Sequence, residues 1–132
     1  MLPKRVDIKI VTPGIPDKKL VFLLTQSYYK QLVEAGIHIY EYTPGFIHAK
    51  CFASDDKVAT VGTINMDYRS LYLHFENGVF MYKNDAVMQL KHDMEKTFEI
   101  SQRITKENVS RKFKKNIDAE CLTITGTITI RG

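Results

Sequence analysis

The N-terminal part of the chain begins with an alternation of apolar and polar residues and continues with a helical period. Residues 6–11 alternate as a half-buried strand does, and the Pro and Gly residues within 12–17 end that pattern. From 18 to 35 a large apolar residue recurs every four positions, and Gly36 stands where the C′ residue of a helix belongs. Residues 37–42 then read as a second strand. This order predicts a βα unit followed by a strand.

The next part of the chain adds a hairpin, another strand and another helix. Residues 47–53 and 57–61 are predicted strands, joined through the turn residues 54–56. Residues 75–82 read as a further strand, and Asn84 is placed to cap a helix in which apolar residues form a stripe. This mixture predicts the α/β class, as a sandwich with a central mixed β-sheet flanked by helices.

Length and composition fit a single compact domain. A chain of 132 residues can bury a core without disulfides, and 44% hydrophobic against 26% charged residues argues against disorder. No apolar run approaches the roughly 20 residues that a membrane-spanning helix needs, and the N-terminus has no signal-peptide pattern. We therefore expect a soluble fragment that is either cytosolic or anchored to a membrane by a segment outside it. Cys51 and Cys121 read as reduced packing residues.

The C-terminal end differs from the rest in composition. We expect the folded domain at residues 1–108 and a tail at 109–132, with a basic run at 111–115 and a Thr/Ile-rich string at 121–131. The tail reads as a native edge strand, a disordered end or residues that are not native to the protein. The net charge of +4 favours anionic partners such as nucleic acid or acidic lipid headgroups, without choosing between them.

The stretch from His48 to Asn65 carries the candidate chemistry. Residues two apart on a strand point to the same face, so His48 and Lys50 would project together. A neutral imidazole can attack phosphorus, while an ammonium beside it stabilises charge on the non-bridging oxygens. Asn65 follows a Gly62-Thr63 turn and is expected at a helix start, where amide and backbone N–H groups add donors for those oxygens.

These residues match the signature of the phospholipase D superfamily position by position. The signature runs H-x-K, four residues, D, six residues and G-[ST]-x-N, and the chain meets its fixed positions from His48 to Asn65. The resemblance implies that His48 forms a phosphohistidine intermediate. It also implies that Lys50 and Asn65 bind the substrate phosphate, with Gly62 and Thr63 in the same phosphate-binding set.

Two carboxylates complete the expected catalytic set of His48, Lys50, Asp55 and Glu76. Asp55 occupies the D of the signature, and the resemblance gives it a supporting role through hydrogen bonds. A nucleophilic histidine needs an acceptor on its second ring nitrogen, and Glu76 is our candidate. Glu76 ends a segment similar to the family's Asn-Phe-Glu triplet, with His74 where Asn is common.

Beyond the signature, residues 40–50 and 61–70 resemble the second catalytic motif region of bacterial cardiolipin synthases, and the resemblance covers about residues 6–108. It implies a phosphatidyltransferase that converts two phosphatidylglycerol molecules, or related anionic phospholipids, into cardiolipin and glycerol without a cofactor or a metal. Because two steps need two histidines, the partner is a second H-x-K domain of the same polypeptide or a second copy of the chain. The resemblance places the longer parent protein at the bacterial cell membrane.

Other interpretations of the same residues stay open. A phospholipase D-type phosphodiesterase would use water as the acceptor, and a homodimeric nuclease of the superfamily would act on nucleic acid, a partner that the synthase interpretation disfavours. A third alternative is a fragment that is inactive in isolation.

For the remaining polar residues we prefer structural roles. Asp67 and Arg69 are expected to brace a loop. His38 and His92 are expected in packing or on the surface, because no metal-ligand spacing involves them. We expect the following aromatic residues in the core rather than in an acyl-chain groove: Tyr28, Tyr29, Tyr40, Tyr42, Phe46, Tyr68 and Tyr72.

Overall fold

The structure, a computed structural model, describes residues 6–15 and 19–109. The elements in chain order are β1 (Lys9–Pro13), α1 (Lys19–Ser27), α2 (Tyr29–Glu34), β2 (His38–Tyr42), β3 (Cys51–Ser54), β4 (Val58–Gly62), α3 (Tyr68–Tyr72), β5 (Gly78–Tyr82), α4 (Asp85–Glu99) and β6 (Gln102–Ile104). The predicted α/β class is confirmed. Apart from Val109, the expected tail, with its basic run and its strand-like string, lies outside the described residues.

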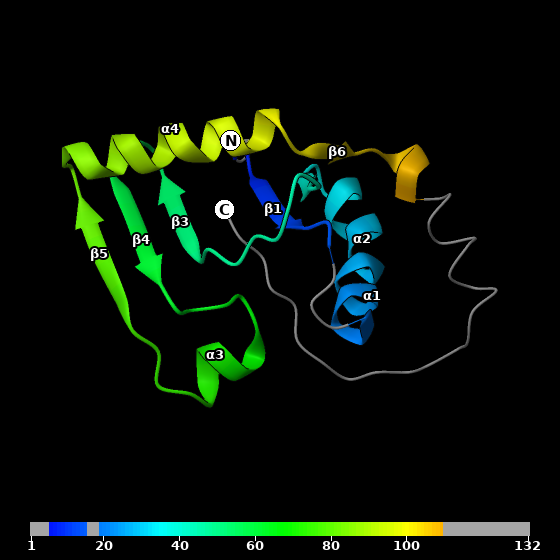
Figure 1. Ribbon diagram of the computed structural model, residues 1–132, viewed down its shortest axis with the longest axis horizontal. Coiled ribbons are helices and arrows are strands. Elements are labelled where there is room, and N and C mark those ends of the chain that lie inside the picture. Colours follow the sequence, from blue (N-terminus) through cyan, green and yellow to red (C-terminus); the bar gives the residue numbers. More distant parts are fainter. Residues whose placement is uncertain (1–5, 16–18, 110–132) are drawn as a thin grey trace, which may run out of the picture.

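The strands divide between two three-stranded sheets (Figure 1). In the first, of order β1-β2-β6, β1 and β2 run parallel and β6 joins β2 antiparallel. In the second, of order β3-β4-β5, all neighbours are antiparallel, and Cys51 pairs with Val61 as the predicted hairpin requires. The mixed sheet is therefore one of two, and β6 was not predicted because a three-residue strand gives little periodicity.

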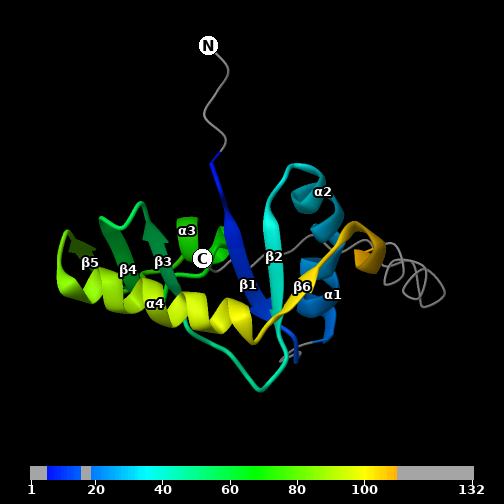
Figure 2. The same ribbon diagram turned by 90° about the horizontal axis from the view of Figure 1, so that it is seen from above.

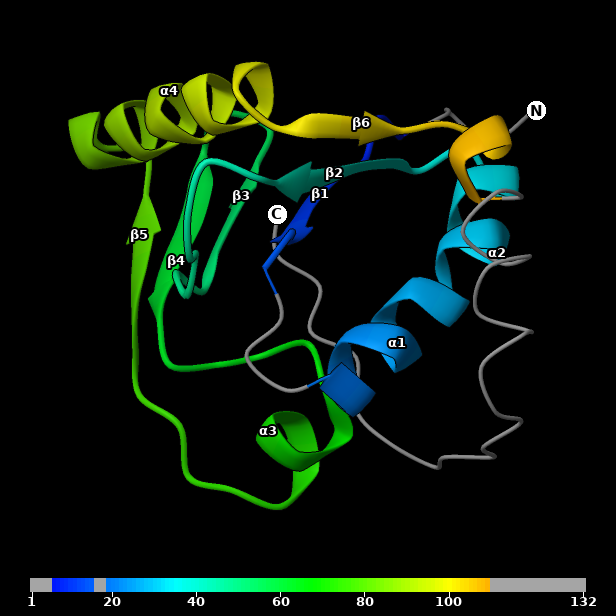
Figure 3. The ribbon, with the colours of Figure 1, turned by 45° about the vertical axis from the view of Figure 1, so that its right-hand side comes forward.

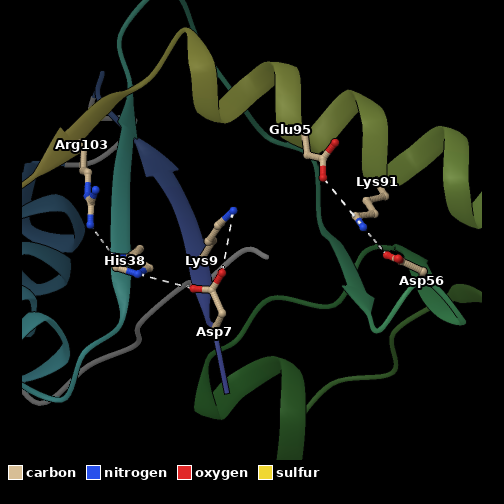
Figure 4. Close-up of polar contacts among 7 residues, drawn as sticks. All are labelled: Asp7, Lys9, His38, Asp56, Lys91, Glu95 and Arg103. Atoms are coloured by element: carbon tan, nitrogen blue, oxygen red, sulfur yellow. Dashed lines mark hydrogen bonds and ion pairs between the residues drawn. The ribbon is translucent and has the colours of Figure 1, made fainter. Parts of the chain in front are cut away.

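Helix α4 connects the two sheets. It runs past strands of both sheets (Figures 1 and 2) and contacts β2, β3, β4 and β5. Lys91 on α4 donates to Asp56 in the β3–β4 turn, and Glu95 lies 3.9 Å from the same ammonium (Figure 4). Val87 on α4 and Ala59 on β4 are fully buried, so packing and one ion pair fix this helix on the second sheet. No helix in the described part of the chain has the length and apolar character needed to cross a membrane.

The main hydrophobic core lies between α2 and the first sheet. It is formed by Tyr29, Ile39, Ile104 and Val109, with partly buried neighbours from α2. Val109 is therefore part of the core, although the domain was expected to end at 108.

A buried polar network borders this core. The Tyr29 hydroxyl shares a hydrogen bond of 2.7 Å with Thr12 Oγ1, and Gln26 Nε2 donates to the nearby Glu41 carboxylate at 3.1 Å. Burial, followed by the charge of Glu41, raises the pKa of Tyr29, so its hydroxyl stays protonated.

Several predicted boundaries were wrong, and the strands expected over 47–53 and 75–82 begin only at Cys51 and Gly78. The first strand includes Thr12 and Pro13, because parallel pairing with β2 continues to Tyr42, and Pro13 is tolerated at the end of an edge strand. The single helix expected over 18–35 is two helices. Thr25 and Ser27 each donate a side-chain hydrogen bond to a carbonyl of the preceding turn, and such bonds bend or interrupt helices.

Two helix ends agree with the sequence. Gly36 has φ +89° after α2, and the N–H groups of Gly36 and Ile37 donate to Val33 and Leu32 in a Schellman arrangement. Asn84 Oδ1 accepts from the Val87 N–H at 3.1 Å, as expected for the N-cap of α4.

Candidate active site

The start of β3, the end of β4 and the start of β5 lie at one edge of the second sheet, away from α4 (Figures 1 and 3). The segment before β3 carries His48 and Lys50, and the segment between β4 and β5 carries Thr63 and Glu76. Antiparallel pairing thus brings most of the expected site residues to the same edge, although they are far apart in the sequence.

His48 and Lys50 meet directly, although both precede β3 instead of lying on the strand expected over 47–53. The Lys50 ammonium lies 3.1 Å from His48 Nδ1 and 3.0 Å from Nε2, and it donates to the His48 carbonyl at 3.0 Å. Because the two ring nitrogens point in divergent directions and only one of them can accept in a neutral ring, one ammonium cannot hydrogen-bond to both, so the contact is with the ring as a whole. His48 is exposed, whereas Lys50 is only 8% exposed. A nearly buried cation therefore faces an accessible imidazole.

Phe46 also contacts the His48 ring. Its ring stacks on the His48 imidazole with centroids 5.9 Å apart and planes 13° from parallel. Phe46 is 58% exposed, so its expected place in the core was wrong. Tyr68 and Tyr72 are also exposed, whereas Tyr29 is buried as expected.

Gly62 fixes the backbone next to Lys50. Its N–H donates to the Lys50 carbonyl at 3.1 Å, which continues the β3–β4 ladder by one bond. A Cβ at this position would lie 2.2 Å from the Asn77 carbonyl oxygen and 2.6 Å from Gly78 Cα. Glycine is therefore required here because the backbone leading into β5 passes too close for any side chain.

Glu76 is held by the Thr63 hydroxyl. Thr63 Oγ1 donates to Glu76 Oε2 at 2.5 Å, and the Ser70 hydroxyl lies close enough to the same carboxylate to influence its pKa. The Thr63 bond, together with the nearby Ser70 hydroxyl and the positive charge of Lys50, lowers the pKa of Glu76 despite an opposing desolvation effect. Glu76 is therefore a carboxylate at neutral pH within electrostatic range of Lys50. Its expected role as the group that orients His48 stays a prediction.

Of the other predicted residues, Thr63 lies at this edge of the sheet and Asp55 lies at the far end of the β3–β4 hairpin. Thr63 uses both of its donors within the chain, the hydroxyl toward Glu76 and the N–H toward the Asn77 carbonyl at 2.8 Å. Asp55 lies in the β3–β4 turn, at the opposite end of β3 from Lys50, with φ +51°. This place suits a supporting role in the turn and keeps Asp55 away from His48.

Asn65 precedes α3 but does not begin it, so its expected place at a helix start was wrong. The N-cap is Asp67, whose Oδ1 accepts from the Ser70 N–H at 2.6 Å. Asp67 is buried and braces the loop, as expected. A capping residue closer to the helix therefore displaced the predicted start by two positions.

Sequence reasoning missed the hydroxyl partners of Glu76 and the pairing of Arg69 with His74. Arg69 Nε donates to His74 Nε2 at 2.8 Å. Spacing within one element can predict that two residues share a face. Thr63, Ser70 and Glu76 lie on three separate segments, so only the tertiary structure brings them together.

In the described ranges, 6–15 and 19–109, no group of three or more His, Cys, Asp or Glu side chains is arranged to hold a metal ion. The charged groups of the edge are instead a lysine beside a histidine and one carboxylate bonded to hydroxyls.

The fold and the His48–Lys50 pair define a phospholipase D-like protein. The family model described as "Cardiolipin synthase, PLD-like domain" matches residues 2–100, and the chain belongs to this family.

Curated relatives agree with this family. The chain is 50% identical over 107 residues to an uncharacterised protein of Streptococcus mutans, which covers 81% of the chain and 23% of that protein. It is 39% identical to a cardiolipin synthase of Geobacillus kaustophilus, over 81% of the chain and 21% of that enzyme. The chain is 38% identical to cardiolipin synthase 2 of Bacillus anthracis, over 85% of the chain and 21% of that protein. The chain thus spans about a fifth of the length of these relatives. No solved structure matches it.

Proposed function

We propose that the chain supplies one half of the phosphatidyltransferase site of a cardiolipin synthase, with His48 as the nucleophile. The observation that carries the proposal is the Lys50 ammonium within 3.1 Å of both ring nitrogens of the exposed His48 imidazole. A fixed cation beside a nucleophile stabilises the negative charge that develops on a phosphate under attack. The relatives named cardiolipin synthase support this reaction class.

In the first step a ring nitrogen of His48 attacks the phosphorus of a phosphatidylglycerol molecule. A phosphorus–nitrogen bond forms, the bond from phosphorus to the glycerol headgroup oxygen breaks, and a second histidine protonates the departing glycerol. Lys50 and Asn65 bind the non-bridging oxygens, and Glu76 accepts a hydrogen bond from the N–H of the other ring nitrogen of His48. The product of this step is a phosphohistidine that carries the phosphatidyl group.

In the second step a headgroup hydroxyl of another phosphatidylglycerol attacks the same phosphorus. The second histidine now removes the hydroxyl proton, the phosphorus–nitrogen bond breaks, and cardiolipin leaves. The sequence contains one H-x-K, so the second histidine comes from another domain of a longer polypeptide or from a second copy. The longer protein would also provide the membrane contact, and the chain alone would be inactive.

The test is conversion of phosphatidylglycerol in detergent micelles by the chain alone, by a longer protein that contains it, and by the longer protein with His48→Ala. We expect cardiolipin and glycerol from the longer protein only, with a loss of at least about a thousandfold in the variant. His92→Ala is the matched control, because His92 is exposed on α4 away from the site, and it should leave turnover unchanged.

Each other outcome identifies a different function. Phosphatidic acid as the main product indicates a phospholipase D with water as the acceptor. Turnover by the chain alone indicates a site built from two copies. Cleavage of nucleic acid with steep salt dependence indicates a nuclease. Full activity of His48→Ala contradicts the nucleophile assignment itself.

A further inference from the structure

Arg69 and His74 are held together beside the candidate active site. In addition to the side-chain bond of 2.8 Å, the Arg69 carbonyl accepts from the N–H groups of Leu73 and His74, each at 3.0 Å. Main chain and side chain thus fix both groups at the end of α3. Because His74 Nε2 accepts from Arg69, a neutral His74 ring carries its own N–H on Nδ1.

The tip of the Arg69 guanidinium remains available. The bond to His74 uses Nε, and within the described part of the chain neither Nη group makes a hydrogen bond or an ion pair. Arg69 and His74 are both exposed. The two parallel N–H groups at the tip match the two non-bridging oxygens of a phosphodiester.

The pair borders the Glu76 carboxylate. Ser70, the residue after Arg69, and His74 both lie close enough to Glu76 to influence its pKa, as does the charge of Lys50. Lys50 thus acts on this carboxylate directly, and Arg69 is a second cation that is bonded to His74 and is next in sequence to Ser70. A site of this kind can hold two anions at once.

Exposed apolar side chains surround the pair. Tyr68 is 65% exposed and Tyr72 is 72% exposed, and their ring centroids lie 4.9 Å apart on α3. Leu71 and Leu73 are exposed as well. Apolar surface next to a cation favours an amphiphilic anion over a free inorganic one.

We propose that Arg69, positioned by His74, binds the phosphodiester of the acceptor lipid. The chemistry requires such a position, because the acceptor phosphatidylglycerol keeps its own charged phosphodiester while its hydroxyl reacts. Lys50 is occupied by the phosphate under attack, and two phosphodiesters close together repel each other unless a second cation is present. Identifying the ligand as the acceptor rests on the proposed function, whereas anion binding at Arg69 does not.

A second Arg–His pair in the same chain provides a matched control. Arg103 Nη2 lies 2.8 Å from His38 Nδ1, and Asp7 approaches the other ring nitrogen at 3.5 Å (Figure 4). This pair therefore uses the guanidinium tip and has its own carboxylate. It carries the same residue types, but the tip of its guanidinium is already bonded, so it should not bind a phosphodiester.

The experiment is a residue-resolved NMR titration of the chain with dimethyl phosphate, a phosphodiester without acyl chains. We expect the Arg69 Nε–H signal to shift, with binding about tenfold weaker in Arg69→Ala and unchanged in Arg103→Ala. Arg69→Lys keeps the charge but loses the two parallel N–H groups of the guanidinium tip, and it should also bind dimethyl phosphate more weakly than the wild type does. The amide spectrum of each variant reports whether it is folded, and Arg69→Lys decides the question if Arg69→Ala is not.

A second arm uses dihexanoyl phosphatidylglycerol below its micelle concentration. Tighter binding than dimethyl phosphate at Arg69 supports a lipid ligand, and equal affinity overturns the lipid assignment. An unmoved Arg69 signal, or equal weakening in Arg103→Ala, overturns the site. Shifts at His48 without shifts at Arg69 contradict this inference and leave the proposed function standing, whereas the reverse pattern contradicts the proposed function and leaves the anion site.

Discussion

Replacement of Gly62 by alanine tests whether this motif position is structural. The new Cβ would lie 2.2 Å from the Asn77 carbonyl oxygen and 2.6 Å from Gly78 Cα, both of which are backbone atoms. No side-chain rotation can relieve such contacts, so the backbone before β5 must move away from β4. That movement weakens the Thr63 N–H bond to Asn77, now 2.8 Å long.

The expected cost follows from three terms. Overpacking costs about 1–3 kcal/mol, and a weakened hydrogen bond adds about 1 kcal/mol. The reduced entropy of the unfolded chain returns about 0.4–1 kcal/mol. The net loss in the free energy of unfolding is therefore about 1–3.6 kcal/mol, a substantial part of the roughly 5–15 kcal/mol typical of a domain.

Urea unfolding followed by far-ultraviolet circular dichroism measures this loss. Gly45→Ala is the control, because its Cβ would meet only Tyr42 Cε1 at 3.9 Å, an ordinary contact. We expect Gly45→Ala to unfold at or slightly above the wild-type urea concentration. Equal midpoints for Gly62→Ala and Gly45→Ala would refute the steric argument.

Two further predictions concern buried and charged partners. Tyr29→Phe should lower the free energy of unfolding by about 1–3 kcal/mol, because it leaves the buried Thr12 hydroxyl without its bond of 2.7 Å. Urea unfolding should show that adding Thr12→Val recovers part of this loss, and full additivity of the two losses would contradict the pairing. The lowered pKa of Glu76 means that its charged form stabilises the folded chain above its unfolded pKa of about 4.3, and that this contribution disappears as pH falls through the lower folded value. Glu76→Gln should therefore be less stable than the wild type at pH 7, by a margin that shrinks as pH falls below the unfolded pKa, and a difference that does not change with pH would contradict the assignment.

The fold could be predicted where the controlling interactions are local. The β3–β4 hairpin, the Asn84 cap and the position of Gly36 follow from turn and capping residues within a few positions of the element. The break at Tyr28 could not be predicted, because the apolar period continues through it. The hydroxyls of Thr25 and Ser27 bond to carbonyls just before the break, a feature that a pattern of apolar residues does not detect.

The site shows the same division between local and tertiary information. The contact between His48 and Lys50 joins residues two apart in one segment, so it is local. The environment of Glu76 depends on how the loop through α3 returns to β5, and on which hydroxyls that loop presents. Sequence reasoning therefore predicted Glu76 as a site residue but did not predict the groups that lower its pKa.

The fixed spacing within the motif can be understood as strand register. Cys51 pairs with Val61, so Lys50 lies opposite Gly62, and the Gly62 N–H bonds to the Lys50 carbonyl. Gly62 in turn pairs with Gly78, which brings Asn77 beside the end of β4. Because side chains alternate along a strand, a shift of one residue in this pairing would turn every side chain of the shifted strand to the other face. The distance in sequence from Lys50 to Gly62 is therefore set by the hairpin, and the chemistry at the sheet edge depends on the hairpin keeping that register.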